Sequence, residues 1–351
     1  MRKITVIFFV CGICLTGCTQ NNKPDFVPAT NPQIQYIGRF DFSHKEAPVF
    51  MYSGCSIKTA FNGTAISLRL KDDNLKNWFT VKLDDSLFIF PSNKMEGAYQ
   101  LAQGLTDKKH TIEISRRTEW HAGNTTFLGF EIDKGKQLVP AEKQSRAIEF
   151  IGDSYICGYG NEGKSNQEHF SYETEDNYLT YSAVTARELK ADYVAVCRSG
   201  IGMYQGYGGD KSFNLPAVYD EVVVNSKAVY DYKNNQPQVV VVALGGNDLS
   251  VPLDSTAFVN TYIQFVQKIR QQCPAAKIIC VTGHSSPGGK FEKFQTHVKA
   301  VVNYLKNIDK NIYYFAFTPF DAHGSDWHPN VKEHQLMANE LIPFIKRIAQ
   351  W

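Results

Sequence analysis

Hydrophobic and polar residues alternate along the first third of the chain. The alternation is clear at residues 66–70, 79–83 and 111–114, and polar turn-like segments separate these runs. A period of two is typical of strands that bury one face, and no helical period interrupts the strands here. Several short strands of this kind predict an antiparallel β-sandwich or jelly roll over residues 33–140.

The pattern changes after about residue 147. Five apolar runs have the length of fully buried strands, and amphipathic, helix-like stretches such as 258–269 and 336–348 separate them. Strands that alternate with helices predict a doubly wound parallel sheet, here over residues 146–351. A chain of this length also exceeds one typical core, so two domains are expected. The five runs are 148–151, 193–196, 239–244, 278–281 and 312–317.

The N-terminus reads as a targeting segment. Arg2 and Lys3 precede an apolar run that is too short to span a bilayer, and residues 15–18 are Leu-Thr-Gly-Cys. This ending resembles a bacterial lipoprotein box, in which cleavage leaves Cys18 as the lipidated first residue. The resemblance implies a lipoprotein signal over residues 1–18, a tether over 19–32, and an exported bacterial lipoprotein anchored to a membrane in the periplasm or at the cell surface. An ordinary secretory signal with a coincidental cysteine is the alternative.

Charge and cysteine content exclude several functions. A net charge of +2 on a mixed background argues against a nucleic acid partner, which needs a concentrated basic face. Beyond the signal, five cysteines remain, an odd number without paired metal-type spacing. We therefore predict no metal, and buried thiols with one disulfide left open. We also expect no cofactor, and a monomer is the default, with the oligomeric state left open. The five are Cys55, Cys157, Cys197, Cys273 and Cys280.

Three short segments carry candidate chemistry, and each follows an apolar strand. They contain Ser154, Asn247 and His328, and the carboxyl ends of parallel strands can gather them at one sheet edge. A serine nucleophile, an amide donor and a histidine base are the groups needed to attack an ester and stabilise its oxyanion. Each segment also has a simpler interpretation, as a helix cap, a turn or a structural histidine. His323 and His284 also lie after strands and are rival bases.

Taken together, the segments resemble the SGNH (GDSL-type) hydrolase superfamily. The matching blocks are Gly152-Asp153-Ser154, the loop at Gly200, Gly245-x-Asn247-Asp248, and the segment that contains His328. The resemblance implies Ser154 as nucleophile and His328 as general base. It also implies an oxyanion hole formed by the Ser154 and Gly200 N–H groups and the Asn247 amide.

Three segments narrow the resemblance to one family within this superfamily. Residues 151–162, 207–209 and 326–329 look like carbohydrate esterase family 2, whose members pair an N-terminal jelly roll with an SGNH domain. That likeness implies a serine esterase that removes O-acetyl groups from plant-wall polysaccharides such as xylan or glucomannan through an acetyl-enzyme. The superfamily acid usually stands three residues before the histidine, where this chain has Ser325. Asp326 is therefore only a candidate third member, and a Ser–His dyad is the alternative.

Aromatic residues flank the predicted site. Trp327, Tyr155 and Tyr207 offer flat faces on which sugar rings can stack, although such residues also simply pack loops. Two other functions stay open at this point: an SGNH lipase or thioesterase that acts on other acyl esters, and a non-catalytic carbohydrate-binding lipoprotein. The sequence does not identify the polysaccharide or the acetylated hydroxyl.

Overall fold

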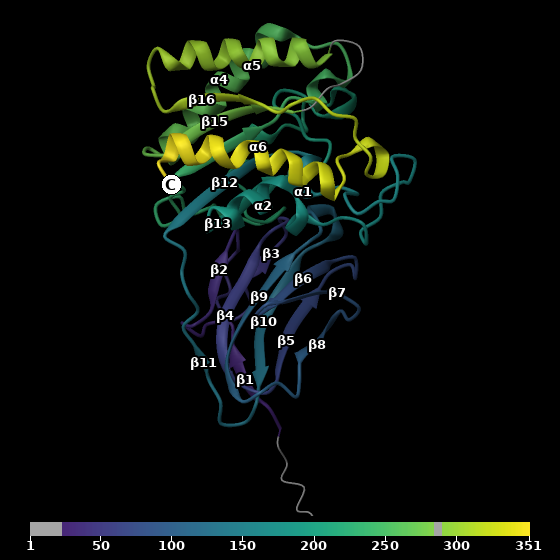
Figure 1. Ribbon diagram of the computed structural model, residues 1–351, viewed down its shortest axis with the longest axis vertical. Coiled ribbons are helices and arrows are strands. Elements are labelled where there is room, and N and C mark those ends of the chain that lie inside the picture. Colours follow the sequence, from purple (N-terminus) through teal and green to yellow (C-terminus); the bar gives the residue numbers. More distant parts are fainter. Residues whose placement is uncertain (1–22, 284–289) are drawn as a thin grey trace, which may run out of the picture.

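A computed structural model of the protein describes residues 23–283 and 290–351, and it has two parts (Figure 1). The N-terminal part is a β-sandwich of two antiparallel sheets, as predicted. One sheet has the order β1-β10-β5-β8, with β3 paired to β10; its strands are β1 (Asp25–Pro28), β3 (Val49–Phe50), β5 (Ile66–Asp72), β8 (Glu96–Ala102) and β10 (Thr125–Ile132). The other has the order β11-β4-β9-β6-β7, with β2 paired to β4; its strands are β2 (Gln35–Ile37), β4 (Ser56–Gly63), β6 (Trp78–Leu83), β7 (Ser86–Pro91), β9 (Lys108–Arg116) and β11 (Leu138–Val139).

The alternating pattern fixes which residues enter the sandwich core. In β5, Ile66, Leu68 and Leu70 are buried between partly exposed neighbours, as a period of two requires. The predicted tether is shorter than residues 19–32, because Asp25–Pro28 forms β1 and pairs with β10. The polar and proline-rich composition of that segment hid a strand which lies at the end of its sheet, where proline is tolerated.

The C-terminal part contains the predicted parallel five-stranded sheet. Its order is β13-β12-β14-β15-β16. The second strand of this part, β13, lies at one edge beside β12, and β14, β15 and β16 follow in order on the other side of β12. This arrangement places the carboxyl ends of β12 and β14 side by side, where open α/β sheets bind their ligands. The strands are β12 (Arg146–Gly152), β13 (Ala191–Cys197), β14 (Val239–Ala243), β15 (Lys277–Thr282) and β16 (Ile312–Ala316).

Helices cover both faces of this sheet. Val239 and Val241 of β14 pack in one cluster with residues of α2 and α6, whereas Val240 and Val242 pack in the other with residues of α4 and α5. Successive strand residues face opposite sides, which explains why these runs are continuously apolar. The helices are α1 (Ser154–Cys157), α2 (Tyr181–Glu188), α3 (Leu215–Val218), α4 (Ser255–Gln272), α5 (Lys290–Lys306) and α6 (Val331–Ala349), and the 3₁₀ turns are η1 (Trp120–Ala122), η2 (Asn177–Leu179), η3 (Tyr207–Gly209), η4 (Asn247–Ser250) and η5 (Ser325–Trp327).

The two parts share a buried interface. Arg39, next to the sandwich, is fully buried, and its Nη2 lies 2.8 Å from Oε1 of Glu149 in β12. The hydroxyl of Tyr219 donates to the other oxygen of Glu149, at 2.8 Å. Because this buried ion pair joins one residue from each part, it helps to hold the two parts in one orientation.

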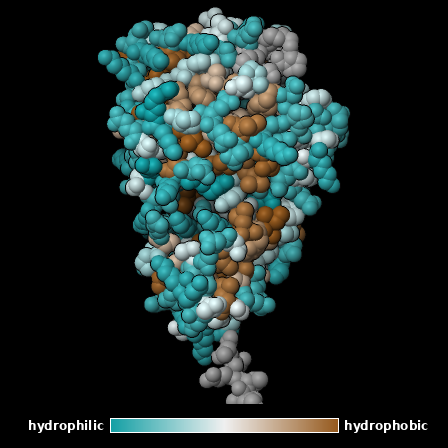
Figure 2. Space-filling view, viewed as in Figure 1, coloured by the Kyte–Doolittle hydropathy of each residue, from teal (hydrophilic) through white to brown (hydrophobic). Residues whose placement is uncertain are grey.

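Hydrophilic residues cover most of the face seen in Figure 2, and hydrophobic ones reach it in patches over both parts. Within residues 23–283 and 290–351, we find no helix with the length and hydrophobicity needed to cross a bilayer. The predicted signal and Cys18 lie outside the described residues, so they stay predictions.

Candidate active site

The turn after β12 presents Ser154 at the sheet edge. β12 ends at Gly152, and Ser154 begins the one-turn helix α1. Oδ1 of Asp153 caps this helix by accepting from the Tyr155 N–H, at 3.2 Å. The neighbouring strand β14 passes so close to Gly152 that a Cβ there would lie 2.8 Å from the carbonyl oxygen of Ala243. Only glycine therefore fits at this position.

The structure brings His328 to Ser154 across 174 residues of sequence. Nε2 of His328 lies 2.9 Å from Oγ of Ser154, which is hydrogen-bond distance. The Nδ1–H donates to the backbone carbonyls of Ser325, at 3.2 Å, and Asp326, at 3.1 Å. With Nδ1 protonated, Nε2 is free to accept the serine proton. Burial lowers the pKa of His328, which keeps the ring neutral at neutral pH, as a general base requires.

A tight turn brings these carbonyls to the ring. Asp326 and Trp327 both have positive φ angles, 48° and 63°, and the His328 N–H donates to the Ser325 carbonyl at 3.0 Å. Two successive left-handed residues are the geometry of a type I′ turn, which is strained for side chains other than Gly, Asn or Asp. Tryptophan in such a position points to a conformation that the surrounding structure enforces.

The carboxylate of Asp326 is not on the histidine ring, which argues against its predicted place in a triad. Oδ2 accepts from the Tyr159 hydroxyl, at 3.0 Å, and from the Phe170 N–H, at 2.9 Å, while Oδ1 lies 2.8 Å from Nδ1 of His169. The left-handed turn directs the side chain of Asp326 away from His328 while its carbonyl faces the ring. Its carboxylate instead anchors Tyr159, whose ring lies 4.2 Å from the His328 ring.

The other two predicted oxyanion donors lie in loops at the same sheet edge. Gly200 has φ +79°, in the left-handed region that favours glycine, and Nδ2 of Asn247 donates to the Ile201 carbonyl, at 2.9 Å. The two loops are therefore joined by this bond, and the amide group of Asn247 has a fixed orientation. Their roles as oxyanion donors stay predictions.

Asp248 has a role that the sequence analysis missed. Its carboxylate accepts backbone N–H bonds from Met203, Tyr204 and Gln205, at 2.8, 2.7 and 2.9 Å. It thereby ties the loop after β13 to the loop after β14. Asp248 was part of the motif that carried Asn247, so the sequence marked its position without indicating this task.

A second buried carboxyl group lies beside the nucleophile. Burial, together with the nearby charge of Asp248, raises the pKa of Asp153 to about 7. Oδ2 of Asp153 lies 3.4 Å from Nδ2 of Asn247. The raised pKa makes the neutral form of Asp153 more populated than an ordinary aspartate would be, which lessens the repulsion of an oxyanion near Ser154.

A cavity of about 690 Å³ opens beside Ser154 and His328. Tyr155, Tyr207 and Trp327 line it, and Tyr207 and Trp327 are strongly exposed, at 73% and 61%. Much of the lining is apolar, because the sheet, its helices and their loops contribute apolar side chains. These include Leu244, Leu249, Val281, Phe294, Phe317 and Met337.

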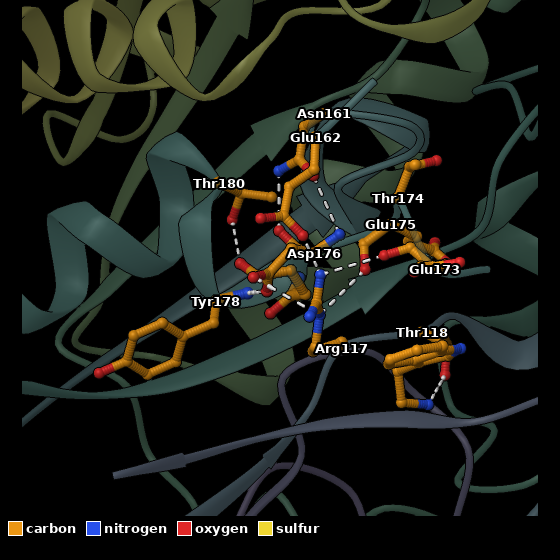
Figure 3. Close-up of polar contacts among 12 residues, drawn as sticks. Arg117, Thr118, Asn161, Glu162, Glu173, Thr174, Glu175, Asp176, Tyr178 and Thr180 are labelled. Atoms are coloured by element: carbon orange, nitrogen blue, oxygen red, sulfur yellow. Dashed lines mark hydrogen bonds and ion pairs between the residues drawn. The ribbon is translucent and has the colours of Figure 1, made fainter. Parts of the chain in front are cut away.

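The sandwich holds the long loop between α1 and η2. Figure 3 shows Arg117, in the segment after β9, among backbone and carboxylate oxygens of this loop. Its guanidinium pairs with Glu162 and with Asp176 (3.5 Å), and it donates to the carbonyls of Glu173 and Glu175, both at 3.3 Å. The same loop carries His169 and the stacked rings of Tyr159 and Phe170. By holding this loop, Arg117 indirectly supports the Tyr159 ring that packs against His328.

The two other histidines considered as general bases, His323 and His284, are not seen beside Ser154. His323 pairs with Glu333 at the start of α6, with Nδ1 2.5 Å from Oε1, and its side chain is 62% exposed. His284 lies outside the described residues. The five cysteines beyond the signal are buried and unpaired in the described structure, and no cluster of metal-ligating side chains occurs within the described ranges.

The sheet and the Ser–His pair are those of a GDSL-type hydrolase. Residues 150–336, more than half of the chain, match the GDSL-like Lipase/Acylhydrolase family, and residues 36–141 match the family described as carbohydrate esterase 2 N-terminal. The chain belongs to carbohydrate esterase family 2.

Relatives support this assignment over nearly the whole chain. The cellulase/esterase CelE of Acetivibrio thermocellus is 36% identical over 327 residues, which are 92% of this chain but only 40% of CelE. An acetylxylan esterase/glucomannan deacetylase of Cellvibrio japonicus is 30% identical and covers 83% of each chain. Among solved structures, a family two carbohydrate esterase from Clostridium thermocellum in complex with cellohexaose superposes with a TM-score of 0.87 at 36% identity, covering 91% of this chain and 99% of that one.

Proposed function

We propose that this protein is a serine esterase that removes O-acetyl groups from plant-wall polysaccharides such as xylan or glucomannan. One observation carries the proposal: the 2.9 Å contact between His328 Nε2 and Ser154 Oγ, with Nδ1–H held by backbone carbonyls. This geometry activates a hydroxyl as a nucleophile without a metal or cofactor. The Cellvibrio japonicus relatives, named acetylxylan esterase/glucomannan deacetylase, support the choice of ester and substrate class.

The proposed reaction has two halves. His328 accepts the Ser154 proton as Oγ attacks the acetyl carbonyl, and the oxyanion is stabilised by the Ser154 and Gly200 N–H groups and the Asn247 amide. The sugar alcohol leaves with the proton from His328. Water, deprotonated by the same ring, then cleaves the acetyl-enzyme and restores Ser154. The imidazolium that forms in each half is stabilised by the carbonyls of Ser325 and Asp326 in place of a carboxylate.

Sugar rings are proposed to bind at the mouth of the cavity. Trp327 and Tyr207 expose most of their ring surface there, and an exposed aromatic ring gains by stacking on an apolar sugar face. The complex of the Clostridium thermocellum relative with cellohexaose supports a glucan-like backbone as one occupant.

Acetate release from acetylated xylan, glucomannan and pectin, measured in parallel, tests the substrate. We expect the first two to be deacetylated and Ser154→Ala to lose at least 10³-fold in kcat, as loss of a serine nucleophile implies. Activity that survives Ser154→Ala would remove the nucleophile. Inactivity of the intact protein on every ester, with retained binding to oligosaccharides, would favour the non-catalytic carbohydrate-binding alternative.

Hydrolysis of longer acyl esters is the second candidate. The apolar side chains in the cavity favour it, because they can accommodate more than a methyl group. Rates on p-nitrophenyl acetate, butyrate and decanoate separate the two: an esterase for acetyl groups prefers the first, whereas equal rates on acetate and decanoate contradict the deacetylase proposal.

We also propose that the mature protein is a lipoprotein anchored through Cys18, with its catalytic part outside the cytoplasm. The basic, apolar and Leu-Thr-Gly-Cys segments of the first 18 residues support this proposal. Membrane fractionation of the wild type and of Cys18→Ala tests it. Equal release of both into the soluble fraction would contradict a lipid anchor.

A further inference from the structure

Glu119 of the sandwich reaches into the catalytic part. It lies between β9 and η1, in the same segment as Arg117, and its side chain is fully buried. Oε2 accepts from the backbone N–H of Ser199, at 2.7 Å, and Oε1 accepts from the hydroxyl of Ser199. Both carboxylate oxygens are thus directed at one residue of another domain.

Ser199 immediately precedes Gly200, the proposed oxyanion donor. The Gly200 N–H belongs to the Ser199–Gly200 peptide, so the position of Ser199 sets where this donor points. At its other end, the same loop is held by the Asp248 carboxylate through Met203, Tyr204 and Gln205. The loop of residues 199–205 is therefore held at its two ends by two buried carboxyl groups, Glu119 of the sandwich and Asp248 of the catalytic part.

The surroundings keep the charge on Glu119. Burial acts to raise its pKa, but hydrogen bonds from His121 and Ser199 outweigh burial and hold the pKa below its usual value. Burial and the charge of Glu119 raise the pKa of nearby Glu175, which favours its neutral form. Oε2 of Glu175 accepts the N–H of Glu119, at 3.2 Å, which fixes the backbone there. A charged acceptor forms hydrogen bonds roughly twice as strong as a neutral one.

We propose that Glu119 is a positioning residue of the esterase, through which the sandwich sets the oxyanion hole by holding Ser199 and the adjacent Gly200 N–H. The inference rests on the proposed function of Ser154 and Gly200. It makes the sandwich a part of the catalytic apparatus, beyond any task in carbohydrate binding. Glu119 itself touches no reacting atom.

Kinetics of Glu119 variants test this role. Full loss of an oxyanion donor costs about 10²–10³ in kcat, so a displaced donor in Glu119→Ala should cost about 10–100-fold. KM for p-nitrophenyl acetate should change less than about threefold, since the donor acts on the transition state. Glu119→Gln keeps an oxygen for the Ser199 N–H and should recover part of the loss. Ser199→Ala removes only the hydroxyl bond and should lose less than Glu119→Ala.

A matched control separates positioning from folding. Glu131→Gln alters another sandwich carboxylate, which pairs with Arg69 (3.0 Å) in the neighbouring strand, and should leave kcat unchanged. Active-site titration with an organophosphate gives kcat per functional site, so a smaller folded fraction does not imitate the effect. A kcat per site within twofold of wild type in Glu119→Ala overturns the proposal, as does a loss confined to KM. If Glu119→Ala does not fold, wild-type values in both Glu119→Gln and Ser199→Ala overturn it.

Hydrogen exchange gives a readout that does not need turnover. Amides of residues 199–205 should exchange faster in Glu119→Gln than in the wild type, and Glu131→Gln should match the wild type. Unchanged exchange in Glu119→Gln overturns the positioning role. A wild type without activity on any ester contradicts the proposed function instead, and the exchange result then still decides whether Glu119 holds the loop.

Discussion

Replacing Asp326 by asparagine distinguishes a dyad from a triad. The change removes the charge but keeps the shape, so an amide oxygen can still accept from the Tyr159 hydroxyl and the Phe170 N–H. The His328 ring keeps both of its carbonyl acceptors, at 3.2 and 3.1 Å, because these belong to the backbone. We therefore expect kcat of Asp326→Asn to stay within about tenfold of wild type, whereas asparagine in place of a triad aspartate costs about 10⁴.

The Asp326→Asn substitution should change the thermal stability of the protein more clearly than it changes kcat. The pKa of Asp326 lies below its usual value despite burial, because His169, Phe170 and Tyr159 bond to the charged form. The ionised carboxylate therefore stabilises the fold above its unfolded pKa, and this contribution is lost as pH falls through the lowered folded pKa. Weakening of three bonds that are each worth about 1 kcal/mol should cost about 1–2 kcal/mol at pH 7. For a chain of this size that is a drop in Tm of about 1–3 °C.

Thermal melting and kcat on p-nitrophenyl acetate, both at pH 7, test these two numbers together. Asp107→Asn is a suitable control, because Asp107 pairs with Lys136 on the exposed sandwich surface, at 2.7 Å, away from the site. A 10³–10⁴-fold loss of kcat in Asp326→Asn without a change in Tm would show that the carboxylate orients His328 in solution, and the dyad would be refuted.

Three further predictions concern the same site. Because burial lowers the pKa of His328, the acid limb of kcat/KM should have its midpoint below about 6.5, and a midpoint above 7 would contradict a buried neutral base. Asn247→Ala should lose about 10²–10³ in kcat with little change in KM, and a loss below fivefold would remove Asn247 from the oxyanion hole. Ser325→Asp should lower both Tm and kcat, although it supplies the superfamily acid, because a Cβ on Gly160 or Gly163 would already lie 2.4 or 2.1 Å from the Ser325 side chain. Higher kcat with unchanged Tm in Ser325→Asp would show that the position can accept the acid.

The fold could be predicted because its signals are local. Period-two alternation located strands such as β5, and continuous apolar runs located the five parallel strands, since each strand is buried on both faces. The strand β1 was missed because its four residues, Asp25–Pro28, are too few to show that alternation and end in proline, and only its pairing with β10 makes it a strand.

The site was predictable only in part, for a related reason. Ser154 and His328 stand in short motifs after strands, so topology alone brings them together. No motif marks Glu119, which lies in another domain and contacts Ser199 only after the whole chain has folded. The direction of the Asp326 side chain depends on two left-handed residues, and Trp327 gives no local indication of such a backbone.

The ion pair between Arg39 and Glu149 affects how this chain can be divided. A fragment that begins near residue 146 would leave Glu149 as a lone buried charge and would uncover apolar surface that now belongs to one continuous core. Hybrids that exchange sandwiches between related enzymes should therefore transfer Arg39 together with the residues it meets. Although two separate family models match the two parts, we expect the parts to unfold together as one unit.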